Sequence, residues 1–199
     1  NVGLIVEHNY LEASHEFHTV NINDNTNLKG FFQRESYFKH VKQDVISALR
    51  FSHEVKSFCA GYLGSFKGTS TVAVHVRRTD YTSYPDNFVN QPIKYYLKAM
   101  DIISNKVQQP LSYLFFSDDM EWCKQNFNAD NFYFVELNKP DIFDICTTSM
   151  CNHHIIANSS FSWWGAYLSN SNGIVICPQN WFGHLSGHSS VALPEWIHI

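Results

Sequence analysis

Short apolar runs and amphipathic helical segments alternate along most of this chain of 199 residues, and this alternation limits the folds open to it. The run from Thr71 to Val76 is largely β-branched and apolar apart from His75, as is typical of a strand buried on both faces. Further strand-like runs span residues 111–116, 132–135, 154–157 and 174–177. Helical segments separate them, over about residues 92–107, from 120 onward, and over 142–151 and 161–168. This order predicts an α/β fold with a doubly wound, parallel, Rossmann-like sheet and a ligand site at the carboxyl ends of its strands.

The first third of the chain carries weaker signals. Residues 36–50 have apolar side chains at helical spacing, with Ser36 as a candidate N-cap. Residues 21–27 are polar and predict a loop, and a glycine-containing loop is expected at 61–68. The predicted sheet begins only after this second loop.

The composition excludes several classes of protein. Hydrophobic residues make up 44% of the chain and charged residues only 16%, which excludes a disordered chain. Fourteen Lys and Arg against 18 Asp and Glu give a net charge of −4, so we expect no nucleic-acid partner bound through its phosphates. No apolar run approaches the roughly 18 residues that span a bilayer. The many Asn, Ser, Tyr and Trp side chains would suit a neutral, hydroxyl-rich ligand such as a sugar.

The five cysteines are odd in number and irregularly spaced, which does not fit a disulfide framework. Cys146 and Cys151 lie near His153 and His154, but this spacing matches no standard zinc template. We therefore expect buried thiols and no metal ion. A metalloprotein that uses some of the 11 histidines is the weaker alternative.

The first polar cluster, H-V-R-R-T-D-Y, follows directly from the strand at 71–76. Strand alternation places His75 and Arg77 on one face of the sheet and Arg78 on the other. An ion pair between an arginine and Asp80 could brace the loop. Alternatively the arginines form an anion clamp, because guanidinium groups match phosphate oxygens and stay charged.

The second cluster places Asp118 and Asp119 at the end of the strand at 111–116. One of these carboxylates can cap the following helix, and the other can accept hydrogen bonds from ribose hydroxyls or a base edge.

The third cluster lies where the strand at 154–157 passes into a helix. Serine hydroxyls and free N–H groups at a helix start form a receptor for phosphate. The same serines can equally cap the helix, while Trp163 and Trp164 fill core space. The polar residues concerned are Asn158, Ser159, Ser160 and Ser162.

In order along the chain, the three clusters closely resemble the three motifs of the α-1,2-fucosyltransferases. The matching segments are H-V-R-R-T-D-Y at 75–81, F-S-D-D-M-E-W-C at 116–123 and H-H-I-I-A-N-S-S-F-S-W-W-G-A at 153–166. In addition, G-F-F-Q-R-E-S-Y-F at 30–38 is similar to the family's G-Y-F-Q-x-x-x-Y-F, and P-Q-N-W-F at 178–182 to its closing P-x-x-W-F. The likeness covers about residues 28–182.

This resemblance implies a GT-B-type, inverting glycosyltransferase that moves L-fucose from GDP-fucose to the 2-hydroxyl of a galactose-terminated glycan. The product carries an α-1,2 linkage, and the family needs no metal ion or other cofactor. The expected domains are the remnant of an N-terminal, acceptor-side domain with a linker over 1–68 and a GDP-fucose-binding domain over 69–199.

The family usually opens with a G-G-L-G-N-Q-x-F-Q segment, and no such segment occurs here. We therefore expect a fragment, most of a larger enzyme whose front is missing. Membrane association through that missing N-terminus is expected. The enzyme would act at the cytoplasmic face in a bacterium or, with a type II anchor, in the Golgi lumen of a eukaryote.

In the resembled family the first motif binds the diphosphate, and the other two complete the GDP site. Arg77 is then the expected clamp of the β-phosphate, where negative charge grows as the glycosidic bond breaks. Asp80 is either the base that deprotonates the acceptor hydroxyl or an orienting group, because a carboxylate paired with arginine is a poor base. The expected catalytic residues are Arg77 and Asp80, and the expected GDP-fucose-binding residues are His75, Arg77, Arg78, Asp118, Asp119, Asn158, Ser159, Ser160 and Ser162.

Of two other classes of function, a binding module stays open and a glycoside hydrolase does not fit the sequence. An incomplete chain could bind a GDP-sugar or a glycan without transferring it. A glycoside hydrolase needs two facing carboxylates at a defined separation, whereas Asp118 and Asp119 are adjacent and point apart.

Overall fold

The computed structural model describes residues 8–12, 17, 19, 22–183 and 190–199. The chain divides into two compact units, Asn1–Ala48 and Leu49–Ile199. This division precedes the boundary at residue 68 that the sequence predicts. Helix α2 (His53–Leu63) packs on helix α6 (Asp141–Met150), and so belongs to the larger unit.

The smaller unit begins with two short parallel strands, β1 (His8–Leu11) and β2 (Thr26–Lys29). Two 3-10 turns, η1 (Glu35–Tyr37) and η2 (Lys39–Val41), lead into helix α1 (Lys42–Ala48). The single helix predicted over 36–50 is therefore wrong in its first half, and Ser36 lies inside a turn rather than at an N-cap. No residue of η1 or η2 is buried, so little packing supports an α-helix over these residues. The acceptor-side role expected of this part stays a prediction.

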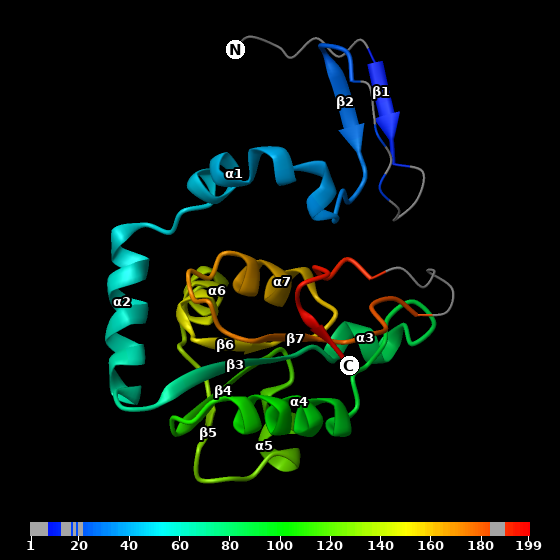
Figure 1. Ribbon diagram of the computed structural model, residues 1–199. Helices are drawn as coiled ribbons and strands as arrows, with labels where there is room; N and C mark the ends of the chain where they lie inside the picture. The colour runs from blue at the N-terminus through cyan, green and yellow to red at the C-terminus, as the bar shows by residue number, and fades with distance from the viewer. Residues whose placement is uncertain (1–7, 13–16, 18, 20–21, 184–189) are drawn as a thin grey trace. The chain divides into compact units, whose positions relative to one another are not determined.

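The larger unit is built on a six-stranded sheet in which all neighbouring strands run parallel (Figure 1). The strand order is β5-β4-β3-β6-β7-β8. The strands are β3 (Ser70–Val76), β4 (Leu111–Ser117), β5 (Phe132–Phe134), β6 (His153–Ile155), β7 (Val175–Cys177) and β8 (Ile197–His198). The first five coincide with the predicted runs, which confirms the doubly wound α/β fold. The short β8 has no counterpart among the predicted strands.

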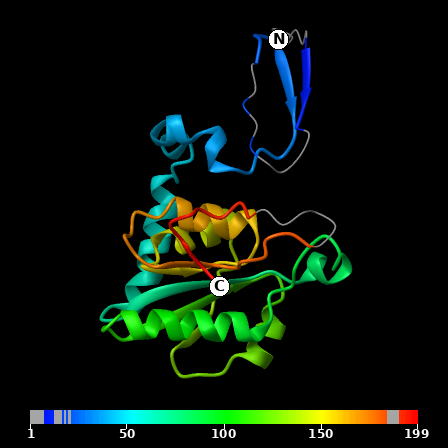
Figure 2. The same ribbon diagram turned by 45° about the vertical axis from the view of Figure 1, so that its right-hand side comes forward.

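Helices cover both faces of this sheet (Figures 1 and 2). Two of them lie on one face and two on the other, where α2 packs beside α6. The pair on the first face is α4 (Ile93–Lys106) and α5 (Met120–Asn126); the second face carries α6 and α7 (Ser160–Tyr167). The remaining elements are η3 (Gly64–Phe66) and the short α3 (Thr79–Ser83), which directly follows β3.

Helix α2 is an element that our sequence analysis missed. Its signals are nevertheless local: the Ser52 side chain accepts a hydrogen bond from Val55 N, and Val55 and Cys59 are buried one turn apart. The apolar pattern of this segment is weak and the segment adjoins a glycine-containing stretch, so the sequence predicted a loop at 61–68 and no helix directly before it.

Successive residues of β3 face opposite helix layers. Val72, Val74 and Val76 pack in a core cluster with residues of α4, whereas Ala73 packs in a separate cluster with Phe116. All five cysteines are free and buried, as predicted. Within the described ranges, no helix is both long enough and apolar enough to cross a membrane.

Candidate functional site

The strand order reverses between β3 and β6, and ligands of doubly wound sheets bind outside the carboxyl ends of the strands at this switch point. The chain proceeds from β3 through β4 to β5 on one side and then returns to build β6, β7 and β8 on the other. The first and third sequence clusters follow β3 and β6 respectively, so the fold brings them to this point. Val76 pairs with Ser117 across β3 and β4, so Arg77 and Asp118 leave the sheet side by side.

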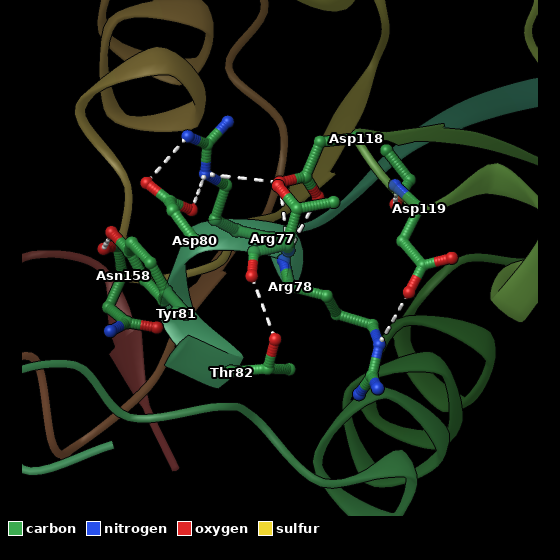
Figure 3. Close-up of polar contacts among 10 residues, drawn as sticks. Arg77, Arg78, Asp80, Tyr81, Thr82, Asp118, Asp119 and Asn158 are labelled. Carbon is green, nitrogen blue, oxygen red and sulfur yellow. Dashed lines mark hydrogen bonds and ion pairs between the residues drawn. The ribbon is translucent and has the colours of Figure 1, made fainter. Parts of the chain in front are cut away.

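Arg77 presents a guanidinium fork at this edge of the sheet (Figure 3). Its Nε and Nη2 each donate a hydrogen bond of 2.9 Å to the carboxylate of Asp80, and Nε lies 3.4 Å from Asp118 Oδ2. The Arg77 side chain is 34% exposed and that of Asp80 is 48% exposed. The pair is bidentate, but its exposure leaves the Arg77 fork accessible to an anion from solution that could compete with Asp80. The hydrogen bond from Arg77 lowers the pKa of Asp80, which disfavours Asp80 as a base.

Asp118 holds the turn that leads from β3 into α3. Its Oδ1 accepts from Arg78 N at 2.9 Å, and its Oδ2 accepts from Thr79 N at 3.1 Å and from the Thr79 hydroxyl. The Asp118 side chain is only 18% exposed. Both of its oxygens thus accept hydrogen bonds from the first motif, which Asp118 braces. The ribose contact expected of this cluster stays a prediction.

Arg78 points away from Arg77, toward α5, as strand alternation predicts (Figure 3). Its Nε donates to Asp119 Oδ2 at 3.1 Å, and its guanidinium carbon lies 3.9 Å from the centre of a Trp122 ring. Asp119 Oδ1 accepts from Trp122 N and caps α5. This confirms that one carboxylate of the second cluster caps the following helix.

Asn158 is buried and joins four segments of the chain. Its carbonyl oxygen accepts from the Tyr81 hydroxyl at 2.7 Å, and its side-chain amide donates to Trp181 O at 2.8 Å. Gln91 Nε2 donates to Asn158 Oδ1 at 3.1 Å. Our sequence analysis named Asn158 but missed Tyr81 and Gln91. Tyr81 lies within the first motif, whereas nothing in the local sequence distinguishes Gln91.

The serines at the start of α7 differ in what they can offer a ligand. Ser159 stands at the N-cap without a side-chain capping bond, and Ser160 is exposed. Ser162 is fully buried, and its hydroxyl donates to Ala157 O and Ser159 O, both at 3.2 Å. As placed, Ser162 therefore supports the turn rather than reaching a ligand. The first N–H groups of α7 have no partner within the helix, as an anion site requires.

His75 is buried beside this site, with its ring 5.1 Å from that of Phe161 in α7. Burial lowers the pKa of His75 to about 4, so the imidazole is neutral at pH 7. Its Nδ1 has no hydrogen-bond partner among the described residues. As a neutral imidazole, His75 adds no positive charge to the site.

Two buried histidines should make the fold sensitive to acid. Burial lowers the pKa of both His75 and His154 to about 4, below the ordinary value of 6.5. Between these two pKa values the unfolded chain binds more protons than the folded protein. The contribution of the two neutral histidines to the free energy of unfolding is therefore complete above about pH 6.5 and is lost as the pH falls toward 4. The loss is at most about 1.4 kcal/mol per pH unit for each histidine. Burial raises the pKa of Asp144 to about 6, which partly opposes this slope.

We expect the urea midpoint of unfolding to decrease as the pH is lowered from 6.5 to 4.5, and to decrease less steeply for His154→Asn. The exposed His40 offers the control, because His40→Asn should leave the slope unchanged. Equal slopes for wild type and His154→Asn would contradict the assignment.

Taken together, the site holds two arginines and three aspartates in the free protein. Each arginine is paired with a carboxylate, and Asp80 is the most exposed of the three acids. Of the two arginines, Arg77 is the more exposed and so the more accessible to an anion. Within the described residues, no group of three or more His, Cys, Asp or Glu side chains is placed to hold a metal ion.

Comparisons with known proteins bear on the family to which the chain belongs. The chain is 33% identical over 183 residues to an alpha-1,2-colitosyltransferase of Escherichia coli, covering 85% of this chain and 61% of that protein. It is 24% identical to galactoside alpha-(1,2)-fucosyltransferase 2 of Sus scrofa, covering 86% of this chain and 55% of that protein. It thus spans about half to two thirds of these relatives. The crystal structure of the fucosyltransferase NodZ from Bradyrhizobium is 16% identical, covering 59% of this chain and 42% of that one, with a TM-score of 0.39. The family model for glycosyl transferase family 11 matches residues 4–199, and the chain belongs to this family.

Proposed function

We propose that this chain carries the donor site of an enzyme that transfers L-fucose from GDP-fucose to the 2-hydroxyl of a galactoside, inverting the anomeric carbon. The observation that carries the proposal is the Arg77 fork at the switch point, beside the start of α7. The family membership and the α-1,2 linkage named for two relatives support the same reaction.

The proposed reaction requires that negative charge on the leaving diphosphate be stabilised. As the bond between the anomeric carbon and the β-phosphate oxygen breaks, the electron pair moves to the leaving diphosphate. Arg77 and the first N–H groups of α7 are donors held in place before the reaction, and such donors stabilise developing charge without reorganisation. The proposal uses no metal ion.

Asp80 takes an orienting role in this proposal. Its carboxylate fixes the Arg77 fork in the free protein and gives way to phosphate when the donor binds. The proposal assigns proton abstraction from the acceptor hydroxyl to another group of the enzyme.

The test is a transfer assay on the full-length protein with GDP-fucose and a β-galactoside. We expect GDP release that depends on the acceptor, and a product whose NMR spectrum shows fucose α-linked to the 2-hydroxyl. A β-linked product would exclude inversion of the β-linked donor. If the enzyme preferred GDP-colitose as donor, the proposed transferred sugar would be wrong, whereas the proposed α-1,2 linkage would stand. Binding of GDP-fucose without transfer would leave only a binding module.

A further inference from the structure

A cavity of about 660 Å³ opens on the α4 side of the larger unit, where the first turn of α4 meets the segment that follows β7. Its lining residues are Val89, Gln91, Pro92, Lys94, Tyr95, Lys98, Gln179, Asn180 and Ile199. The cavity does not include Arg77, Asp118 or the start of α7. It is therefore a feature separate from the Arg77 site.

Both charged side chains that line this cavity are positive. Lys94 and Lys98 lie one turn apart on α4 and both line it, and none of the nine lining residues is acidic. In the part of the chain that the structure describes, no carboxylate forms an ion pair with either lysine. Like charges at this spacing destabilise a helix. An anionic ligand between the two ammonium groups would remove that repulsion.

The remaining walls suit a sugar ring. The Tyr95 hydroxyl donates to Ile156 O at 2.7 Å, which anchors the buried ring, and Val89 and Pro92 add apolar surface. Gln91 and Asn180 bring amide groups, which can both donate and accept hydrogen bonds. Apolar walls with a few convergent polar groups are typical of small-molecule sites.

The cavity is also tied to the donor site. Gln91 Nε2 donates to Asn158 Oδ1 at 3.1 Å and to Asn180 O at 3.3 Å. Asn158 in turn accepts from Tyr81, whose ring lies 5.8 Å from the Arg77 guanidinium carbon. One wall of the cavity thus connects to the anion clamp through two hydrogen-bonded residues. A saccharide chain that reaches the donor site could place a neighbouring sugar here.

We propose that this cavity is a subsite for an acidic sugar of the acceptor glycan, with its anionic group held between Lys94 and Lys98. This inference rests on the proposed function, because it assigns the bound saccharide to the acceptor. The chemistry of the walls specifies an anion on a sugar ring, and either a carboxylate or a phosphate would meet that requirement.

The experiment compares two galactosides that differ only in whether the adjoining sugar is glucuronic acid or glucose. Binding is measured by calorimetry on the full-length protein without donor. Transfer is measured separately as KM and kcat. We expect the acidic ligand to bind about tenfold more tightly, as one charge-assisted hydrogen bond would give, and the difference to shrink at high salt. A third galactoside with a sugar phosphate in place of the uronate identifies which anion is preferred.

Lys94→Gln with Lys98→Gln should abolish the preference and leave affinity for the neutral galactoside and for GDP unchanged. Lys106→Gln is the matched control, because Lys106 lies on α4 outside the cavity and is exposed. Glutamine is nearly as good a helix former as lysine, so these variants should fold.

Equal affinity of the wild-type protein for the acidic and neutral galactosides would overturn the subsite. It would also be overturned if Lys106→Gln reduced the preference for the acidic galactoside as much as Lys94→Gln with Lys98→Gln. Transfer with equal KM for both galactosides would remove the subsite and leave the proposed function intact. Lysine-dependent binding of the acidic galactoside without any transfer would retain the anion site and refute the proposed function.

Discussion

An Arg77→Lys enzyme should turn over about 10²–10³-fold more slowly than wild type, which is the usual effect of losing one donor that stabilises developing charge. Lysine keeps the positive charge but cannot form the two parallel hydrogen bonds that Arg77 now makes with Asp80. Because Arg77 is one-third exposed, we expect little change in the free energy of unfolding. The measurements are kcat, KM for the donor, and GDP affinity by calorimetry.

Two variants control this prediction. Arg50→Lys makes the same chemical change at an exposed residue between α1 and α2 and should leave turnover unchanged. Asp80→Asn removes the charge that orients Arg77. If Asp80 orients, GDP affinity should change together with turnover, whereas loss of turnover at constant GDP affinity would assign a chemical role to Asp80. Wild-type turnover in Arg77→Lys would exclude the clamp.

Asp118→Asn should weaken the first motif without touching a ligand directly. The amide keeps one accepting oxygen but turns an NH₂ group toward donors, so at least one of the bonds from Arg78 N, Thr79 N or the Thr79 hydroxyl is lost. A poorly exposed donor left without a partner costs about 1–3 kcal/mol. We expect a lower urea midpoint and weaker donor binding, because Arg77 loses its second carboxylate.

The neighbouring Asp119→Asn makes the same change with a different expected result. Asparagine can keep the cap on α5, because it caps helices about as well as aspartate, but it loses the bond that Asp119 Oδ2 accepts from Arg78 Nε. This ion pair is partly exposed and fewer bonds are at risk than at Asp118, so the urea midpoint should fall less than for Asp118→Asn. If Asp118→Asn were no less stable than Asp119→Asn, the bracing role of Asp118 would be wrong.

Local sequence patterns were sufficient for most of the larger unit. The β-branched run of β3, the apolar stripe of α4 and the capping Asp119 each follow from residues close together in the chain. The same reasoning failed over residues 36–41, where the structure has two 3-10 turns. Apolar side chains at helical spacing do not by themselves stabilise an α-helix, and no residue of η1 or η2 is buried.

The sequence by itself determined the parallel α/β fold, the family resemblance and the three clusters that meet at the site. Only the tertiary structure decided what each side chain does there. In the folded protein Asp118 accepts hydrogen bonds from the first motif, the Ser162 hydroxyl donates to backbone carbonyls, and Gln91 donates to Asn158. These partners are up to 67 residues apart in the chain. Local preferences specify elements, whereas strand order and register decide which distant residues become neighbours.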